Sequence, residues 1–151
     1  MIATPKDVPH ILEMGKSFCR ALAEDYDEDT IVSTIMRMIS SPTEVILVED
    51  GGMVGAICYP HFFNVRHGIA QELFWWVNPD TRGNGIGVKL LAELEAWARD
   101  MGVSRLMVSS MASMPDIGVL YERKGFRRFE QNWIKELGCP SESAQRSSAA
   151  L

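Results

Sequence analysis

The stretch of this sequence best suited to chemistry is Arg82-Gly83-Asn84-Gly85-Ile86-Gly87. Three glycines within five residues cost chain entropy on folding, which indicates that bare backbone is needed there. The stretch follows an apolar run that ends at Val77 and precedes an amphipathic run. The first N–H groups of a helix have no intrahelical acceptor, and the helix dipole adds about half a positive charge at that end. The segment is therefore predicted to bind an anion, such as a pyrophosphate.

Three phosphate-binding motifs and one ligand-free alternative were compared with this segment. A Walker A loop requires Gly-Lys-Ser/Thr, which Lys89-Leu90 does not supply. A dinucleotide fingerprint requires GxGxxG, and from Gly83 and Gly85 its last glycine position is Val88. The third motif is an acyl-coenzyme A loop, Arg/Gln-x-x-Gly-x-Gly/Ala after Val-x-Pro, and it matches the segment and the preceding Val77-Asn78-Pro79. A glycine-rich loop without a ligand remains the structural alternative.

The third motif resembles that of the GCN5-related N-acetyltransferase (GNAT) superfamily. A second segment, Tyr121-Glu122-Arg123-Lys124-Gly125-Phe126, is similar to the Tyr-x-x-x-Gly-Phe end of that family's helix before its last strands. The resemblance extends from about residue 3 to residue 136 and is most specific over residues 72–90. It implies an acetyl-CoA-dependent N-acetyltransferase without a metal, acting on a small-molecule or protein amine. A homodimer is compatible with it.

The resemblance also implies where acetyl-CoA binds. The molecule would lie where the strand ending at Val77 splays from a strand at Leu106–Ser109, a central splay of the sheet. The binding residues are expected to be Trp76, Val77, Arg82, Gly83, Asn84, Gly85, Ile86 and Gly87. Pantetheine would pair with the end of the strand at Trp75–Val77, and a backbone N–H near Val77 would polarise the thioester carbonyl.

Two residues are candidates for catalysis. Tyr121 matches the family tyrosine that protonates the departing thiolate, although a packed core tyrosine is the structural alternative. Glu72 is the candidate general base, because strand alternation predicts that it shares a face with Phe74 and Trp76, whose apolar surroundings would raise its pKa. A solvated glutamate at a strand end is the alternative.

Other residues near the predicted cleft could shape the acceptor site. His61 and His67 flank a turn and could line that site, although loop histidines are usually solvated. Phe62, Phe63, Trp75 and Trp76 make this region unusually aromatic, and most of them are expected in the core.

Periodicity predicts the elements that position these residues. Helices are expected at about 8–22, 29–39, 85–101 and 115–124, and strands at about 44–49, 53–60, 69–77 and 106–109, with a final strand or hairpin at 126–137. The order predicts an α/β (α+β) GNAT fold with a mixed sheet of five to seven strands and four helices. A single domain is expected over residues 1–137, followed by a disordered tail at 138–151 that lacks large apolar residues except the final leucine.

Composition excludes several classes of function. Fifteen basic against twenty acidic residues give a net charge of −5, which argues against a nucleic-acid partner. No apolar run approaches the ~20 residues that span a bilayer, and the N-terminus lacks a signal-peptide pattern, so a cytoplasmic protein without a membrane partner is expected. The three cysteines have no zinc or disulfide spacing.

The sequence leaves two alternatives to the acetyltransferase hypothesis. One is a non-catalytic acyl-CoA-binding module, which serves as a sensor or an assembly component. The other is acyl transfer from a longer thioester such as succinyl-CoA. The identity of the acceptor amine is not encoded in any motif that we identified.

Overall fold

The computed structural model describes residues 1–111 and 113–137, which fall into two compact units, one ending at Pro115 and one beginning at Asp116. The predicted tail at 138–151 lies outside the described residues. The elements of the first unit are α1 (Val8–Leu22), α2 (Glu28–Ser40), β1 (Glu44–Glu49), β2 (Gly52–His61), β3 (Asn64–Val77), α3 (Ile86–Asp100) and β4 (Arg105–Met107), with short 3₁₀ turns at Pro5–Asp7 and Pro79–Thr81. The second unit contains α4 (Gly118–Arg123).

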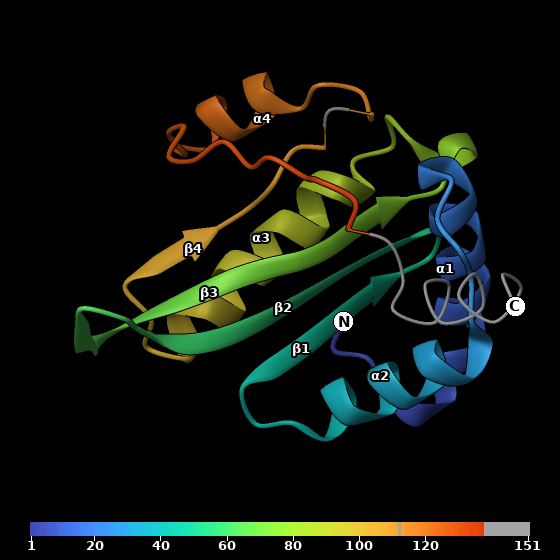
Figure 1. Ribbon diagram of the computed structural model, residues 1–151, viewed down its shortest axis with the longest axis horizontal. Helices are drawn as coiled ribbons and strands as arrows, with labels where there is room; N and C mark the ends of the chain where they lie inside the picture. The colour runs from blue at the N-terminus through green and yellow to red at the C-terminus, as the bar shows by residue number, and fades with distance from the viewer. Residues whose placement is uncertain (112, 138–151) are drawn as a thin grey trace, which may run out of the picture. The chain divides into compact units, whose positions relative to one another are not determined.

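The sheet of the first unit has the strand order β1-β2-β3-β4 (Figure 1). Strands β1, β2 and β3 pair in antiparallel fashion, and β4 is parallel to β3 over three residue pairs only. The chain start adds a short extension at β1, where the Ala3 N–H donates to the Ile46 carbonyl at 2.8 Å. Residues 1–3 also pair with β1 at a single antiparallel bridge, between Ile2 and Leu47.

Helices bury both faces of β1. Val45 and Leu47 pack in a cluster with Leu90 and Leu94 of α3. Ile46 and Val48 point to the other face and pack with residues of the first two helices: Ile11 and Met14 of α1, and Ile35 and Met38 of α2. A strand covered on both faces is apolar at every position, which explains the uninterrupted run Val45-Ile-Leu-Val48.

The ends of the helices follow local signals in the sequence. Asp27 caps α2, because its carboxylate accepts a hydrogen bond from the Thr30 N–H at 2.8 Å. Gly102 follows α3 with a φ of +68°, the left-handed conformation that glycine adopts without steric cost and that commonly ends helices. The predicted helix at 85–101 is therefore confirmed, with the observed bounds Ile86–Asp100.

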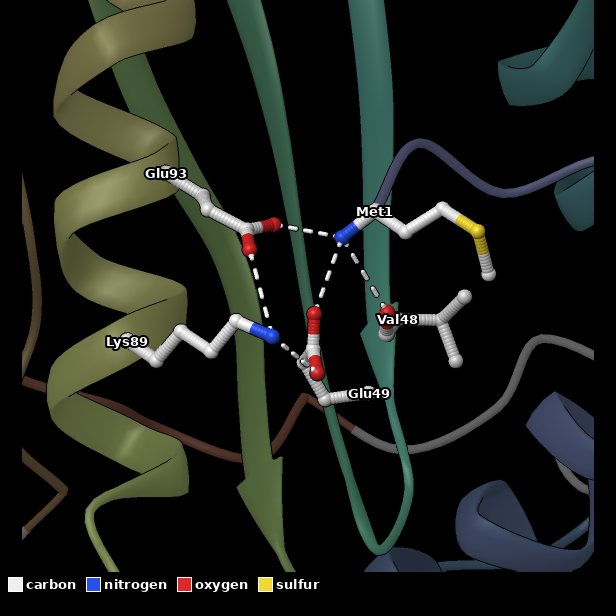
Figure 2. Close-up of polar contacts among 5 residues, drawn as sticks. All are labelled: Met1, Val48, Glu49, Lys89 and Glu93. Atoms are coloured by element: carbon white, nitrogen blue, oxygen red, sulfur yellow. Dashed lines mark hydrogen bonds and ion pairs between the residues drawn. The ribbon is translucent and has the colours of Figure 1, made fainter.

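A charged network attaches the chain start and β1 to α3 (Figure 2). The Met1 ammonium group pairs with Glu49 of β1 and Glu93 of α3, and Lys89 of α3 lies 2.6 Å from the other oxygen of Glu49. Burial lowers the pKa of the Met1 ammonium group, but the hydrogen bonds to Glu93 and Glu49 outweigh it and leave that pKa raised. The ion pair with Glu49 therefore holds the Lys89 side chain toward β1.

The sheet has fewer strands than the five to seven predicted, because residues 126–137 form no strand in the described chain. The apolar residues there are Phe126, Phe129, Trp133, Ile134 and Leu137. Their spacing of three, four, one and three does not alternate, so no single face of a strand would be apolar. Trp133, Ile134 and Leu137 are accordingly more than 80% exposed. The prediction of a strand or hairpin at 126–137 was wrong.

None of the helices within residues 1–111 and 113–137 is long and apolar enough to cross a membrane.

Candidate functional site

The Arg82–Gly87 segment connects the turn after β3 to the first turn of α3. Gly83 and Gly85 have φ angles of +86° and +83°, which side-chain-bearing residues rarely adopt. A Cβ atom built on either glycine would meet no atom of the described residues within 4 Å, its chain neighbours aside. The backbone of this loop is therefore open to a ligand on the side where a side chain would project.

The first turn of α3 directs donor groups toward this open side. The first hydrogen bond of the helix runs from the Lys89 N–H to the Gly85 carbonyl at 2.9 Å. The N–H groups of Ile86, Gly87 and Val88 precede it and have no acceptor in the preceding turn of the helix. These donors and the helix dipole suit an anion. The residues present therefore fit a pyrophosphate group.

Gly87 serves a different purpose from the other two glycines. A Cβ atom at residue 87 would lie 3.3 Å from the Trp75 ring and 3.6 Å from a Val77 methyl group. The absence of a side chain therefore lets α3 pack closely on the end of β3. This contact fixes the distance between the strand end and the open loop.

The Arg82 side chain turns back onto the end of β3. Its Nε atom donates to the Val77 carbonyl at 3.0 Å, and its guanidinium carbon lies 5.1 Å from the centre of the Trp76 ring. Trp76 is buried, and its indole N–H donates to the Asn78 side chain at 2.8 Å. Arg82 and Trp76 thus brace the strand end, while the backbone of the loop remains the open surface.

Strands β3 and β4 pair only as far as Gln71 and Met107, whereas β3 continues to Val77. Beyond Gln71, the edge of β3 that faces away from β2 has no strand partner among the described residues. A free edge of this kind can accept an extended chain through backbone hydrogen bonds. The sheet therefore opens between β3 and the chain after β4, where the sequence predicted a splay.

Glu72 lies where this separation begins. Its side chain is buried, with 8% of the residue exposed, and its Oε2 atom accepts a hydrogen bond from the Ser109 N–H at 2.8 Å. Burial raises the pKa of the Glu72 carboxyl group, and the hydrogen bond from Ser109 offsets only part of that rise. The carboxylate is therefore a stronger base than an exposed glutamate. No sequence signal identified Ser109 as its partner.

A β-bulge changes the face on which Glu72 was predicted to lie. Glu72 pairs with Ala56, and Phe74 pairs with Gly55, so Leu73 is an extra residue in β3. Ala56 belongs to the cluster beneath α3, whereas Phe74 packs against the cluster beneath α1 and α2. Directly paired residues of antiparallel strands share a face, so the prediction that Glu72 shares a face with Phe74 was wrong. Simple alternation fails because a bulge adds a residue without advancing the partner strand.

Distance also separates Glu72 from Val77. Five residues of extended strand span roughly 16 Å. A backbone N–H at Val77 and the Glu72 carboxylate therefore cannot act on the same carbonyl carbon. The expected N–H donor near Val77 and the expected base Glu72 therefore lie far apart along β3.

Tyr121 lies in α4, in the second unit, and is buried. Its ring centre is 5.6 Å from that of Phe126, and the Phe126 N–H donates to the Tyr121 carbonyl at 3.0 Å. Gly125 makes this return possible with a φ of +86°. The segment from Tyr121 to Phe126 is therefore one compact helix end.

The histidines and phenylalanines of the β2–β3 turn lie away from the open loop. His67 precedes Val77 by ten residues of strand, which corresponds to about 33 Å. Phe62 and Phe63 are 89% and 87% exposed, so two of the four aromatic residues of this region lie outside the core, where most of the four were expected. They occupy the tip of a hairpin that extends beyond β1, where no helix covers them.

Residues 1–111 and 113–137 contain no group of three or more His, Cys, Asp or Glu side chains arranged to hold an ion.

Comparisons with known proteins agree with this geometry. Residues 11–126 match the sequence model of the Acetyltransferase (GNAT) family. An aminoglycoside N(6')-acetyltransferase type 1 from Stenotrophomonas maltophilia is 33% identical over 57 residues, which is 38% of this chain and 37% of that relative. The matched region thus spans well under half the length of that curated relative.

Solved structures share the fold at low sequence identity. An acetyltransferase of Trypanosoma brucei has a TM-score of 0.69 at 21% identity and covers 91% of this chain and 97% of its own. An aminoglycoside antibiotic 6'-N-acetyltransferase from Acinetobacter haemolyticus has a TM-score of 0.70 at 13% identity, and the match covers 92% of this chain and 97% of that one. A transcriptional regulator from Bacillus halodurans has a TM-score of 0.73 at 17% identity, and the match covers 91% of this chain and 97% of that one.

The family match covers the splayed strands, the open glycine loop and the helix end at Tyr121 together. On this evidence the chain belongs to the acetyltransferase (GNAT) family.

Proposed function

We propose that this protein is an N-acetyltransferase that transfers the acetyl group of acetyl-CoA to an amine. The observation that carries the proposal is the open loop at Gly83 and Gly85, which leads from the free edge of β3 into α3. The match to the GNAT family supports the same reaction.

The loop would bind the donor through its backbone. The N–H groups of residues 83 and 85–88 would hold the pyrophosphate, and the pantetheine chain would run along the free edge of β3 from Val77 toward Glu72. The bulge at Leu73 interrupts the ladder with β2, so it is the region of β3 in which a backbone N–H could turn toward the thioester carbonyl. Such a donor typically contributes about 2.7–4 kcal/mol to stabilisation of the transition state.

Glu72 would act as the general base. An amine with a pKa near ~10.4 is almost wholly protonated at pH 7, and its deprotonation costs about 4.6 kcal/mol. Glu72 would take a proton from the amine, directly or through a water molecule, as the nitrogen attacks the thioester carbon. Collapse of the intermediate then forms the amide and expels the thiolate of CoA.

Tyr121 would protonate that thiolate. Its match to the family tyrosine, in the segment from Tyr121 to Phe126, carries this assignment. The nitrogen of the ammonium form loses two protons in all. One passes to solvent through Glu72, and the other is balanced by the proton that reaches the departing sulfur. No metal is required by these steps.

The acceptor is proposed to be a cationic amine, with aminoglycosides as the first class to test. The curated relative from Stenotrophomonas maltophilia is an aminoglycoside acetyltransferase. The connector between α1 and α2 adds exposed Glu24, Asp25 and Asp27, which would attract a cation. A cytoplasmic location and the absence of a nucleic-acid partner remain our predictions, as does the compatibility with a homodimer.

The test is release of CoA thiol by the full-length protein. Acetyl-CoA and succinyl-CoA serve as donors, and an aminoglycoside, a polyamine and a peptide with a free N-terminus serve as acceptors. Acceptor-dependent release from acetyl-CoA supports the proposal, and preference for succinyl-CoA would reassign the donor. Tight CoA binding without turnover on the panel would favour an acyl-CoA-binding module instead.

A further inference from the structure

A second set of polar residues gathers at the other end of the first unit, about 33 Å of strand away from the glycine loop. It surrounds a depression of about 260 Å³ beside the β2–β3 turn, which we call the hairpin pocket. The pocket is lined by His61, Asn64, His67, Ser104 and Arg105. None of them has a part in the proposed acetyl transfer.

The acceptor atoms of two lining residues are used within the hairpin itself. The His61 Nδ1 atom accepts the Phe63 N–H at 3.2 Å, so a neutral His61 carries its proton on Nε2. The Asn64 Oδ1 atom accepts the Arg66 N–H at 3.2 Å, which leaves the side-chain NH₂ group as its remaining polar group. Both residues therefore offer donors.

Arg105, the charged residue of the pocket, has no anionic partner in the part of the chain that the structure describes. Arg105 and His67 take part in none of the ion pairs there, and no carboxylate lines the pocket. The protein as a whole has a net charge of −5, so a pocket that is lined by an arginine and by no carboxylate differs from its average composition.

The floor of the pocket is fixed by backbone contacts. The Gly68 carbonyl accepts both the Ser104 N–H at 2.9 Å and the Ser104 hydroxyl at 3.1 Å. Arg105 follows directly and pairs with Ile69 in the parallel ladder. The guanidinium group is therefore attached to an ordered backbone.

We propose that the hairpin pocket binds a phosphate group. Arginine forms paired hydrogen bonds with phosphate oxygens, and the imidazole and amide donors of His61, His67 and Asn64 can serve the other oxygens. A phosphate group suits this set better than a carboxylate because it has more oxygens to accept from several directions. The phosphate belongs either to a free compound or to a lipid, whose surface would also take up the exposed Phe62 and Phe63.

Histidine NMR tests the proposal, because the chain has only three histidines. Inorganic phosphate is titrated at constant pH and ionic strength, with chloride as the reference anion. The imidazole signals of His61 and His67 should shift in a saturable way, while His10 of α1 stays unchanged and serves as the internal control. Vesicles of phosphatidylcholine with and without phosphatidylglycerol form the second arm, read by co-sedimentation.

Two variants distinguish phosphate binding in the hairpin pocket from nonspecific attraction of phosphate to positive charge. Arg105→Gln should weaken phosphate binding by about tenfold or more, as expected for loss of charged hydrogen bonds. Arg66→Gln removes the same charge from an exposed residue of the same hairpin that does not line the pocket, and should bind like the parent protein. If Arg105→Gln lowers the melting temperature, His67→Gln is a second substitution in the pocket that tests the same binding.

The outcomes are distinct. One outcome is a saturable shift of the His61 and His67 signals with inorganic phosphate. If Arg105→Gln weakens this binding and Arg66→Gln does not, the pocket binds the phosphate of a free compound. Binding to phosphatidylglycerol vesicles alone, with the same pattern of variants, assigns the phosphate to a lipid. Equal weakening by both arginine variants, or no saturable response in either arm, would overturn the proposal.

Discussion

Burial of Glu72 connects its proposed chemistry to the pH dependence of turnover. Its pKa is raised above the ordinary glutamate value of 4.5 because the side chain is buried, with partial compensation by the Ser109 N–H. A base is active when deprotonated, so kcat/KM should rise with pH through this raised pKa.

Glu72→Gln should lower kcat by about 10²-fold or more, since a general base contributes roughly 10²–10⁴. The acidic limb of the pH–rate profile should disappear in this variant, because the titrating carboxyl group is gone. Steady-state kinetics from pH 5 to 9 would measure both effects. Asp100→Asn, at the exposed end of α3, is the matched control. An unchanged acidic limb in Glu72→Gln would remove this residue from the mechanism.

The same pKa has a consequence for stability that does not depend on catalysis. Because the folded-state pKa is raised, the native protein binds more protons than the unfolded chain between 4.5 and that higher value. The contribution of Glu72 to stability is therefore lost as pH rises through this window. Glu72→Gln can still accept from the Ser109 N–H, so its melting temperature relative to the parent should increase with pH above 4.5. If the melting temperatures of the two proteins changed with pH in parallel from pH 4 to 8, this effect would be contradicted.

Tyr121→Phe tests the proposed acid. The change removes one hydroxyl group and keeps the ring that packs near Phe126. We expect kcat to fall by about 10²-fold, as for loss of a general acid, with unchanged affinity for CoA. Stopped-time assays and calorimetric titration with CoA measure the two quantities. Tyr59→Phe, in β2, is the control for the substitution itself.

At the scale of elements, the glycine loop and the end of α3 offer a matched pair of substitutions. Gly85 and Gly102 both have positive φ angles, +83° and +68°. Within residues 1–111 and 113–137, a Cβ atom on either would meet no atom within 4 Å other than those of its chain neighbours. Alanine at each should therefore cost a similar ~1–2 kcal/mol of folding stability. Only Gly85→Ala should also weaken CoA binding, because its methyl group would occupy the space of the pyrophosphate. Urea unfolding and CoA titration of both variants would show this; equal CoA affinity in the two would make the loop structural.

The sequence predicted the elements better than their irregularities. The helices at α1, α2 and α3 and the β1–β2 hairpin were found because each has an apolar period, and Gly102 indicated the end of α3. The bulge at Leu73 was missed, because a bulge depends on the partner strand and changes no residue type. The loop at Gly83 and Gly85 could be predicted because positive φ angles require glycine. The bond between Glu72 and Ser109 could not, since it joins residues 37 positions apart.

At the scale of the whole molecule, charge is unevenly distributed over a chain with a net charge of −5. The exposed connector between α1 and α2 is acidic, whereas the hairpin pocket at the far end of β3 contains only neutral and basic residues. A cationic acceptor and a phosphate group would thus be drawn to different parts of the first unit. Raised ionic strength should weaken both attractions, because exposed charges are screened within about 10 Å at 0.1 M salt.

Ligand-dependent melting tests the donor site in the intact chain. A ligand that binds only the native state adds about 2.7 kcal/mol of stability at a hundred times its Kd, which corresponds to roughly 5–10 °C for a protein of this size. Acetyl-CoA and free CoA should both produce this shift, since each contains the pyrophosphate that the loop would hold. NAD should not, although it also contains a pyrophosphate, because it lacks the pantetheine chain that would pair with the free edge of β3. A shift with all three would indicate a loop that binds pyrophosphate without selecting the donor, and a shift with none would leave the open backbone at Gly83 and Gly85 without a ligand.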